Sequence, residues 1–353
     1  MISRIGVLGA GGIGGSIAAY LTQAGRDVTV IDQWGAHIDA IKKKGLTVSD
    51  VNQEFTVRLP ALHLSEVSGI AKPFDAVFLS VKSYDTVWST HLIAPYLSPS
   101  GCIIPAMNCL NDETVARIVG YSRAVGCVTT ISAGVYTPGH VVRTDPTTLH
   151  AFSVGELSGI VTPRVKQIVE MLGVIGHSEA TTNIWGARWA KLVWNSMGNA
   201  MAGLIASNSE GLTEAQRVEM LTFRARIGLE ATQVAAAKGI VLGPVGGIPP
   251  EDFDTARASG DLSILVEGLR SGLGKRELTA EQMARLPEPN RPSLFQDVLK
   301  RRRTEVDFLN GEIVRQGALV GIATPANQRM VAVMHRLEAG EIAPGVENLA
   351  LLR

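Results

Sequence analysis

The chain has few cysteines, no excess of charge of either sign and no long apolar run. Its 353 residues include only three cysteines, and 33 Lys and Arg residues balance 33 Asp and Glu residues. Cys102, Cys109 and Cys127 have neither CxxC spacing nor a histidine cluster beside them, which predicts reduced cytoplasmic thiols and no disulfide framework or metal site. The balanced charge argues against nucleic acid or an anionic membrane as a partner. No segment approaches the roughly 20 apolar residues that span a bilayer.

One apolar segment carries a stripe of polar side chains. Residues 185–206 read WGARWAKLVWNSMGNAMAGLIA, which predicts a helix buried around nearly its whole circumference. Lys191, Asn195 and Asn199 recur every four residues and therefore lie along one face of this helix. These groups need partners, because unpaired polar groups are costly to bury. In an arbitrary protein such a stripe more often ties two helices together, and the alternative is that it binds a ligand.

The N-terminal segment has the pattern of a dinucleotide-binding unit. A β-prone run, Arg4 to Leu8, is followed by a glycine-rich turn, a helix from Ile13 to Gln23 that stops at Gly25, and a second strand from Val28 to Ile31. Such glycines permit a tight turn and a close approach of the backbone to a pyrophosphate at the helix N-terminus. The predicted cofactor-binding residues of the turn are Gly9, Ala10, Gly11, Gly12, Ile13 and Gly14.

Asp32 closes the second strand, where a carboxylate can accept hydrogen bonds from both ribose hydroxyls of NAD. The same charge would repel the 2′-phosphate of NADP, and no Lys or Arg follows until Lys42. We therefore predict NAD, with NADP as the alternative cofactor. A structural alternative for Asp32 is a cap on the next helix, which is expected to start near Gly35.

The rest of the first half continues the doubly wound pattern. Strands are expected from Asp75 to Val81 and from Cys102 to Pro105, with Lys82 and Asn108 directly after them. The carboxyl ends of such strands form the ligand-binding edge of an open α/β sheet, so both residues are candidates for the cofactor site or ordinary turn residues. Antiparallel strands between 123 and 154 and a helix from Val161 to Leu172 complete a predicted Rossmann domain over residues 1–182.

The second half, residues 183–353, is predicted to be all-helical. One helix runs from Glu214 to Lys238 and stops at Gly239, and the Pro- and Gly-rich stretch from Gly243 to Arg291 is expected to be an insertion with one short helix. A long helix is then expected from Ser293 to about Gln316.

Glu305 falls on the apolar face of this last predicted helix and therefore needs a cation. Candidates are Lys191 and the neighbouring run Arg301 to Arg303. Ser293 and Gln296 match a capping box, which is the structural alternative for Ser293. A straight helix would separate Ser293 from Glu305 by about 18 Å, too far for one small substrate. Either the helix bends or begins later, or Ser293 is only a cap.

Together these motifs resemble the ketopantoate reductase (2-dehydropantoate 2-reductase) family over nearly the full chain. The segments that carry the resemblance are GAGGIG at 9–14, VKSYDT at 81–86, the Asn108 loop, KLVWNSMGN at 191–199 and SLFQDVLKRRRTEVDFLNG at 293–311. The resemblance implies a Rossmann domain, a helical domain and NAD(P)-dependent reduction of a 2-keto acid, as in pantothenate biosynthesis.

The resemblance also implies roles for individual residues. Lys191 matches the general acid, and Glu305 matches the acid that orients the lysine and contacts the cofactor. Lys82, Asn108 and Ala133 match cofactor-side positions. The substrate-side positions implied are Lys191, Asn195, Asn199, Ser293 and Gln296.

The chain departs from the family pattern at four places. Asp32 stands where an arginine or another NADP-compatible residue is usual, and Met107-Asn108-Cys109 replaces the usual Gln-Asn-Gly. Asn208-Ser209-Glu210 replaces Asn-Gly-Glu, and the region from Gly243 to Arg291 is longer than usual. These departures bear on the identity of the substrate and leave the reaction type intact.

The sequence thus predicts an NAD(P)-dependent oxidoreductase acting between a 2-keto acid and its 2-hydroxy acid. Its partner would be a small carboxylic acid, and the pattern allows a homodimer. One alternative is a family relative that oxidises a different hydroxylated substrate with NAD. Another, from a different class, is a non-catalytic protein that senses NAD(H).

Overall fold

The computed structural model describes residues 2–206, 211–272 and 278–353. The chain divides into two compact units. Unit 1 comprises Met1–Ile184 and Arg276–Asn290, and unit 2 comprises Trp185–Lys275 and Arg291–Arg353.

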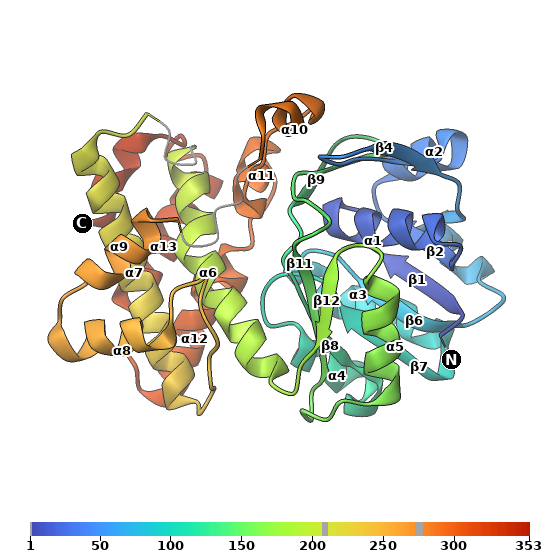
Figure 1. Cartoon of the computed structure of the whole chain (residues 1–353), viewed down its shortest axis with the longest axis horizontal. Coiled ribbons are helices and arrows are strands. Elements are labelled where there is room, and N and C mark those ends of the chain that lie inside the picture. Colours follow the sequence, from blue (N-terminus) through green and yellow to red (C-terminus); the bar gives the residue numbers. More distant parts are fainter. Residues whose placement is uncertain (1, 207–210, 273–277) are drawn as a thin grey trace. The chain divides into compact units, whose positions relative to one another are not determined.

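A five-stranded parallel sheet lies at the centre of unit 1, with strand order β5-β2-β1-β6-β7 (Figure 1). Both faces of the sheet are covered, as is usual for parallel sheets. In β1, for example, Ile5 and Val7 pack into one apolar cluster, while Leu8 belongs to the cluster on the opposite face. The strands are β1 (Arg4–Leu8), β2 (Asp27–Asp32), β5 (Ala61–His63), β6 (Phe74–Leu79) and β7 (Leu97–Pro105).

Two smaller sheets extend unit 1. The first has the order β4-β3-β10-β9 and the second has the order β12-β11-β8. The antiparallel pairing expected between residues 123 and 154 is present as β9 with β10 and β8 with β11, but in two separate sheets that each also contain a parallel pair. The strands are β3 (Leu46–Ser49), β4 (Glu54–Val57), β8 (Val125–Thr129), β9 (Ala133–Thr137), β10 (His140–Arg143), β11 (His150–Glu156) and β12 (His177–Ala180).

Helices connect the strands of unit 1. They are α1 (Gly12–Gln23), α2 (Gly35–Lys44), α3 (Thr86–Ile93), α4 (Asp112–Val119) and α5 (Pro163–Leu172), with short 3₁₀ turns at Leu64–Gly69, Ser83–Asp85, Ala94–Tyr96 and Tyr121–Arg123. α1 ends as predicted: Gly25 has a φ of 78°, and the Arg26 N–H donates to the Leu21 carbonyl.

Unit 2 is helical among its described residues, which confirms the predicted combination of a Rossmann-type sheet and an all-α region. Its helices are α6 (Ile184–Ile205), α7 (Glu214–Ala237), α8 (Pro250–Ser259), α9 (Ser263–Arg270), α11 (Ser293–Leu299), α12 (Asn310–Val320) and α13 (Pro325–Glu338), with 3₁₀ turns at Val306–Phe308 and Val346–Leu352. α7 packs against α8, α9, α12 and α13.

The single long helix expected from Ser293 to Gln316 is wrong. α11 ends at Leu299, and α12 begins only at Asn310. The break is a Schellman motif: the Arg302 N–H donates to the Asp297 carbonyl, and the Arg301 N–H donates to the Val298 carbonyl. This motif needs a left-handed residue, and Arg301 adopts it with a φ of 50°. Glycine usually fills that position, so an arginine there conceals the helix end from a sequence-based prediction.

The expectation of one short helix between Gly243 and Arg291 is also wrong. The described part of this stretch contains α8, α9 and α10 (Ala280–Arg285). α10 groups with unit 1, where the Arg285 guanidinium donates to the Asn52 carbonyl at 3.1 Å. Within the described ranges, no helix is long and apolar enough to cross a membrane, and no group of three or more His, Cys, Asp or Glu side chains could hold a metal ion.

Candidate functional site

The glycine-rich turn joins β1 to α1, and each of its glycines has a different environment. Gly9 has a φ of 97°, and a Cβ added there would lie 2.5 Å from the Ser80 carbonyl oxygen. A Cβ on Gly14 would lie 1.9 Å from the Gly9 oxygen, so the turn and the helix are in direct contact. A Cβ on Gly11, by contrast, would meet no protein atom within 4 Å. The fold therefore requires glycine at 9 and 14, while the requirement at 11 would come from a ligand that approaches the backbone.

Asp32 lies at the end of β2 and binds this turn directly. Its Oδ2 atom accepts the Ala10 N–H at 2.6 Å, and its Oδ1 atom accepts the Trp34 N–H at 2.7 Å. α2 begins at Gly35 without a side-chain cap, so the capping alternative for Asp32 does not hold. The carboxylate instead fixes two backbone segments at the carboxyl edge of the sheet, where it is partly exposed.

His37 is a residue of this edge that the sequence analysis missed. It is buried, its Nε2 atom lies 2.9 Å from the Ala10 carbonyl, and its Nδ1 atom accepts the Gly139 N–H at 2.8 Å. Because a backbone N–H can only donate, Nδ1 carries no proton and Nε2 donates. Burial lowers the pKa of His37 below its ordinary value, although the Asp32 charge and the Ala10 carbonyl act in the opposite direction. A lone histidine in α2 gave no sequence signal for this role.

The loops that carry Lys82 and Asn108 are linked through Asn111, another residue that the sequence analysis missed. The Asn111 amide donates to the Asn108 carbonyl at 2.8 Å and to the Ser83 hydroxyl at 3.1 Å, and it accepts from the Thr86 hydroxyl at 3.1 Å. Since β6 and β7 are parallel neighbours, the structure brings these two loops to the same edge of the sheet as the glycine turn and Asp32.

Cys109 stands at the position of the glycine in the Gln-Asn-Gly pattern, and its backbone keeps a glycine-like conformation. Its φ is 70°, in the left-handed region where glycine is usual. The backbone path of the loop is therefore one that glycine favours, and the cysteine side chain is buried within it.

Ala133 begins β9 and lies against the start of α1. A Cβ added to Gly12 would meet the Ala133 carbonyl oxygen at 2.5 Å. Of the predicted cofactor-side residues, the structure thus brings the turn 9–14, Asp32 and Ala133 together in unit 1, with Lys82 and Asn108 in the loops after the adjacent strands.

In unit 2, the predicted substrate-side residues lie on α6 and at the start of α11. Asn195 is buried, while Lys191 and Asn199 are half-buried. A Cβ on Gly203 would lie 2.7 Å from the Leu294 side chain, so the two helices approach closely. Just before this contact on each helix, the Asn199 amide nitrogen lies 3.4 Å from the Ser293 hydroxyl.

The capping box predicted for Ser293 and Gln296 is not present. Pro292 is the N-cap of α11 and Ser293 is its first helical residue. The Gln296 amide donates to the Arg291 carbonyl at 3.0 Å and so reaches back to the residue before the cap. Ser293 is therefore on α11 without acting as its cap.

Glu305 is buried, but it lies in the segment between α11 and α12 and not on a helix face. Its carbonyl accepts the Phe308 and Leu309 N–H groups at 3.0 Å. Of the neighbouring arginines, Arg302 pairs with Asp297 at 2.5 Å and Arg303 lies 3.6 Å from Asp307. Because no continuous helix joins Ser293 to Glu305, the estimate of about 18 Å between them no longer applies. The predicted change at Asn208-Ser209-Glu210 lies outside the described residues.

Comparison with known proteins gives matches along most of the chain. The family model described as ketopantoate reductase PanE/ApbA matches residues 5–158, and its C-terminal counterpart matches residues 183–338. The chain is similar to 2-dehydropantoate 2-reductases from Archaeoglobus fulgidus (29% identical, over 96% of this chain and 99% of the relative) and Pyrococcus horikoshii (27%, over 95% and 98%). Among solved structures, the ternary structure of D-mandelate dehydrogenase with NADH and anilino(oxo)acetate shares the fold, with a TM-score of 0.76 at 22% identity over 96% of this chain and 99% of that one.

Proposed function

Because the chain belongs to the ketopantoate reductase family, we propose that it is an NAD(P)-dependent oxidoreductase acting between a 2-keto acid and its 2-hydroxy acid. The curated relatives are named for the reduction of 2-dehydropantoate, and they match along nearly their whole length. The observation that carries the proposal is the contact of Asp32 with the glycine turn, since it joins the two elements that bind a dinucleotide.

The residues of unit 1 fit a nicotinamide dinucleotide. The open space at Gly11 leaves room for a pyrophosphate at the N-terminus of α1. Asp32 keeps lone pairs for ribose hydroxyls while it holds Ala10 and Trp34, and its charge favours NAD over NADP. Lys82, Asn108 and Ala133 complete the cofactor side of the proposal. A bound nicotinamide would supply or accept the hydride.

The residues of unit 2 supply the polar groups for the substrate. Lys191 is the proposed general acid, which donates a proton to the carbonyl oxygen during reduction and removes it during oxidation. Asn195, Asn199, Ser293 and Gln296 hold the substrate carboxylate and hydroxyl, and the pairing of Asn199 with Ser293 supports a shared role for α6 and α11. Glu305 orients the Lys191 ammonium.

Substitution of Lys191 tests the proposal. Lys191→Ala should lower kcat at least about a hundredfold while NADH still binds, because positioned proton transfer contributes about 10²–10⁴-fold. Direct NADH titration and turnover on a panel of 2-keto acids that includes ketopantoate measure both properties. Wild-type turnover by this variant would remove Lys191 from the mechanism.

The same panel, with hydroxylated substrates and NAD added, tests the alternative of a relative that oxidises another compound. NADH binding without turnover on any acid would instead favour a sensing role. The proposal includes a cytoplasmic protein, consistent with three buried cysteines that are thiols and not disulfides. A homodimer remains a prediction that light scattering can check.

A further inference from the structure

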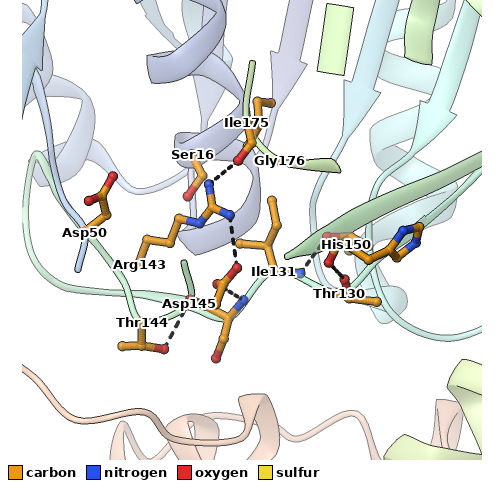
Figure 2. A network of polar contacts seen from close by, with 12 residues as sticks. Ser16, Asp50, Thr130, Ile131, Arg143, Thr144, Asp145, His150, Ile175 and Gly176 are labelled. Carbon is orange, nitrogen blue, oxygen red and sulfur yellow. Dashed lines mark hydrogen bonds and ion pairs between the residues drawn. The ribbon is translucent and has the colours of Figure 1, made fainter. Parts of the chain in front are cut away.

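A buried ion pair in unit 1 lies next to the proposed cofactor site without being part of it. Arg143, at the end of β10, and Asp145 are almost completely buried, and their side chains lie 3.0 Å apart. Figure 2 shows the Arg143 guanidinium pointing toward both the Asp145 carboxylate and the Ile175 carbonyl, which accepts a hydrogen bond at 2.5 Å. The guanidinium carbon also lies 5.4 Å from the centre of the Tyr20 ring of α1.

The pair fixes the turn that precedes β9. The second carboxylate oxygen of Asp145 accepts the Ser132 N–H at 2.6 Å. The Ser132 carbonyl in turn accepts the Thr144 N–H at 2.8 Å, and Ala133 is paired with Arg143 in the β9–β10 register. Arg143 and Asp145, which flank Thr144 in the sequence, thus hold the turn 130–133 in place.

Through Ala133, this turn packs against the start of α1. The Ala133 carbonyl occupies the space where a side chain of Gly12 would stand, so a shift of Ser132 would move a peptide group against the glycine turn. A buried ion pair adds little net stability compared with apolar side chains of the same size. Its distinguishing contribution here is a directional acceptor for the Ser132 N–H, from a carboxylate that is itself almost completely buried.

We propose that Arg143 and Asp145 are positioning residues for the dinucleotide, which act by holding the turn 130–133 against the N-terminus of α1. The inference rests on the proposed function, since it assumes that a nicotinamide dinucleotide binds at this turn. Asp145 supplies the acceptor, and the Arg143 guanidinium orients that carboxylate through their contact at 3.0 Å. Neither residue contacts the cofactor in this scheme.

Two double variants of the full chain distinguish the effect of losing the hydrogen-bond acceptor from the effect of losing the two charges. Arg143→Met/Asp145→Asn removes both charges and keeps an oxygen for the Ser132 N–H, whereas Arg143→Met/Asp145→Leu has nearly the same shape and no acceptor. We expect the leucine variant to bind NADH about tenfold more weakly than the asparagine variant. Its KM for NADH should rise by the same factor, with kcat at saturating NADH within about twofold.

A matched control is Glu156→Gln, which removes the charge of another buried carboxylate of unit 1, one that pairs with the partly exposed Arg164. This variant should lower Tm and leave the Kd for NADH unchanged, because the Glu156 carboxylate binds Thr162 and Arg164 at the start of α5. If the leucine double variant does not fold, Asp145→Glu keeps both charges and displaces the acceptor by one methylene. It should also weaken NADH binding, by about fivefold.

The outcomes are distinguishable. If the wild type does not bind NADH, the proposed function itself fails. If the wild type binds NADH and the leucine and asparagine variants bind it equally well, or are weakened equally, the positioning role is wrong while the proposed function stands.

Discussion

The Asp32 carboxylate and the Ala10 N–H are joined by a hydrogen bond of 2.6 Å, which ties the end of β2 to the glycine turn after β1. This contact places one negative charge at the point where a cofactor ribose is expected.

Asp32→Ser should lower the preference for NADH over NADPH by about tenfold or more. The substitution removes the charge that would repel a 2′-phosphate and the acceptor for the ribose hydroxyls. The ratio of kcat/KM with the two cofactors measures the effect. Asp39→Ser is the matched control, because Asp39 is a highly exposed acid of α2 and loses the same charge. A wild-type enzyme that prefers NADPH would contradict the reading of Asp32.

Gly11→Ala should mainly weaken NADH binding, whereas Gly14→Ala should mainly lower the stability of the fold. A methyl group at 11 meets only open space, so the unfolding temperature should change little while NADH binds about tenfold or more weakly. A methyl group at 14 would collide with the Gly9 carbonyl, which should cost about 1–3 kcal/mol of stability. Thermal unfolding and NADH titration of both variants make the comparison. Unaltered NADH affinity in Gly11→Ala would place the phosphates elsewhere.

His37 should make the protein less stable below about pH 6.5. Its folded-state pKa is lowered from the ordinary value of 6.5, so below that pH the unfolded chain binds a proton that the folded chain does not. Stability is therefore unaffected by this group above pH 6.5 and falls as the pH drops toward the folded pKa. His37→Gln should destabilise the protein by about 1–3 kcal/mol at pH 7.5, because one buried hydrogen bond is lost.

That difference between wild type and His37→Gln should become smaller at pH 5.5, since the variant cannot titrate there. Urea unfolding of both proteins at the two pH values provides the measurement. An NMR titration that gives His37 a pKa of 6.5 or above would refute the neutral form.

Arg301→Gly should stabilise the protein by about 0.5–1 kcal/mol. Arg301 is exposed and has a φ of 50°, a conformation that costs a non-glycine residue about 1–2 kcal/mol, partly offset by the greater chain entropy of glycine in the unfolded state. Lys300→Gly is the control, because Lys300 has an ordinary φ of −85° and should gain nothing. Denaturant unfolding measures both. Equal effects of the two substitutions would show that the backbone conformation is not the cause.

The elements with strong periodicity or a conventional ending could be predicted from sequence. The first strand was expected from Arg4 to Leu8 and has those bounds, and α6 was expected within one residue of its observed ends. α1 and α11 end in the same Schellman geometry, yet only the first was predicted, because Gly25 marks it and Arg301 does not. A left-handed arginine is adopted because the surrounding hydrogen bonds compensate its cost, and those bonds are not visible in a linear sequence.

The candidate site likewise contains residues that the sequence predicts and residues that only the folded structure reveals. From the sequence alone we could predict the glycine turn, the position of Asp32 and the polar stripe on α6, since each depends on spacing within one or two neighbouring elements. The folded chain was needed to identify the contacts of His37, Asn111, Arg143 and Asp145. His37 meets a backbone group 102 residues away, and Asn111 meets a hydroxyl 28 residues away. Such partners are chosen when strands and loops distant along the chain are packed together and every buried polar group must find a partner, a condition that acts on the whole fold and not on any local pattern.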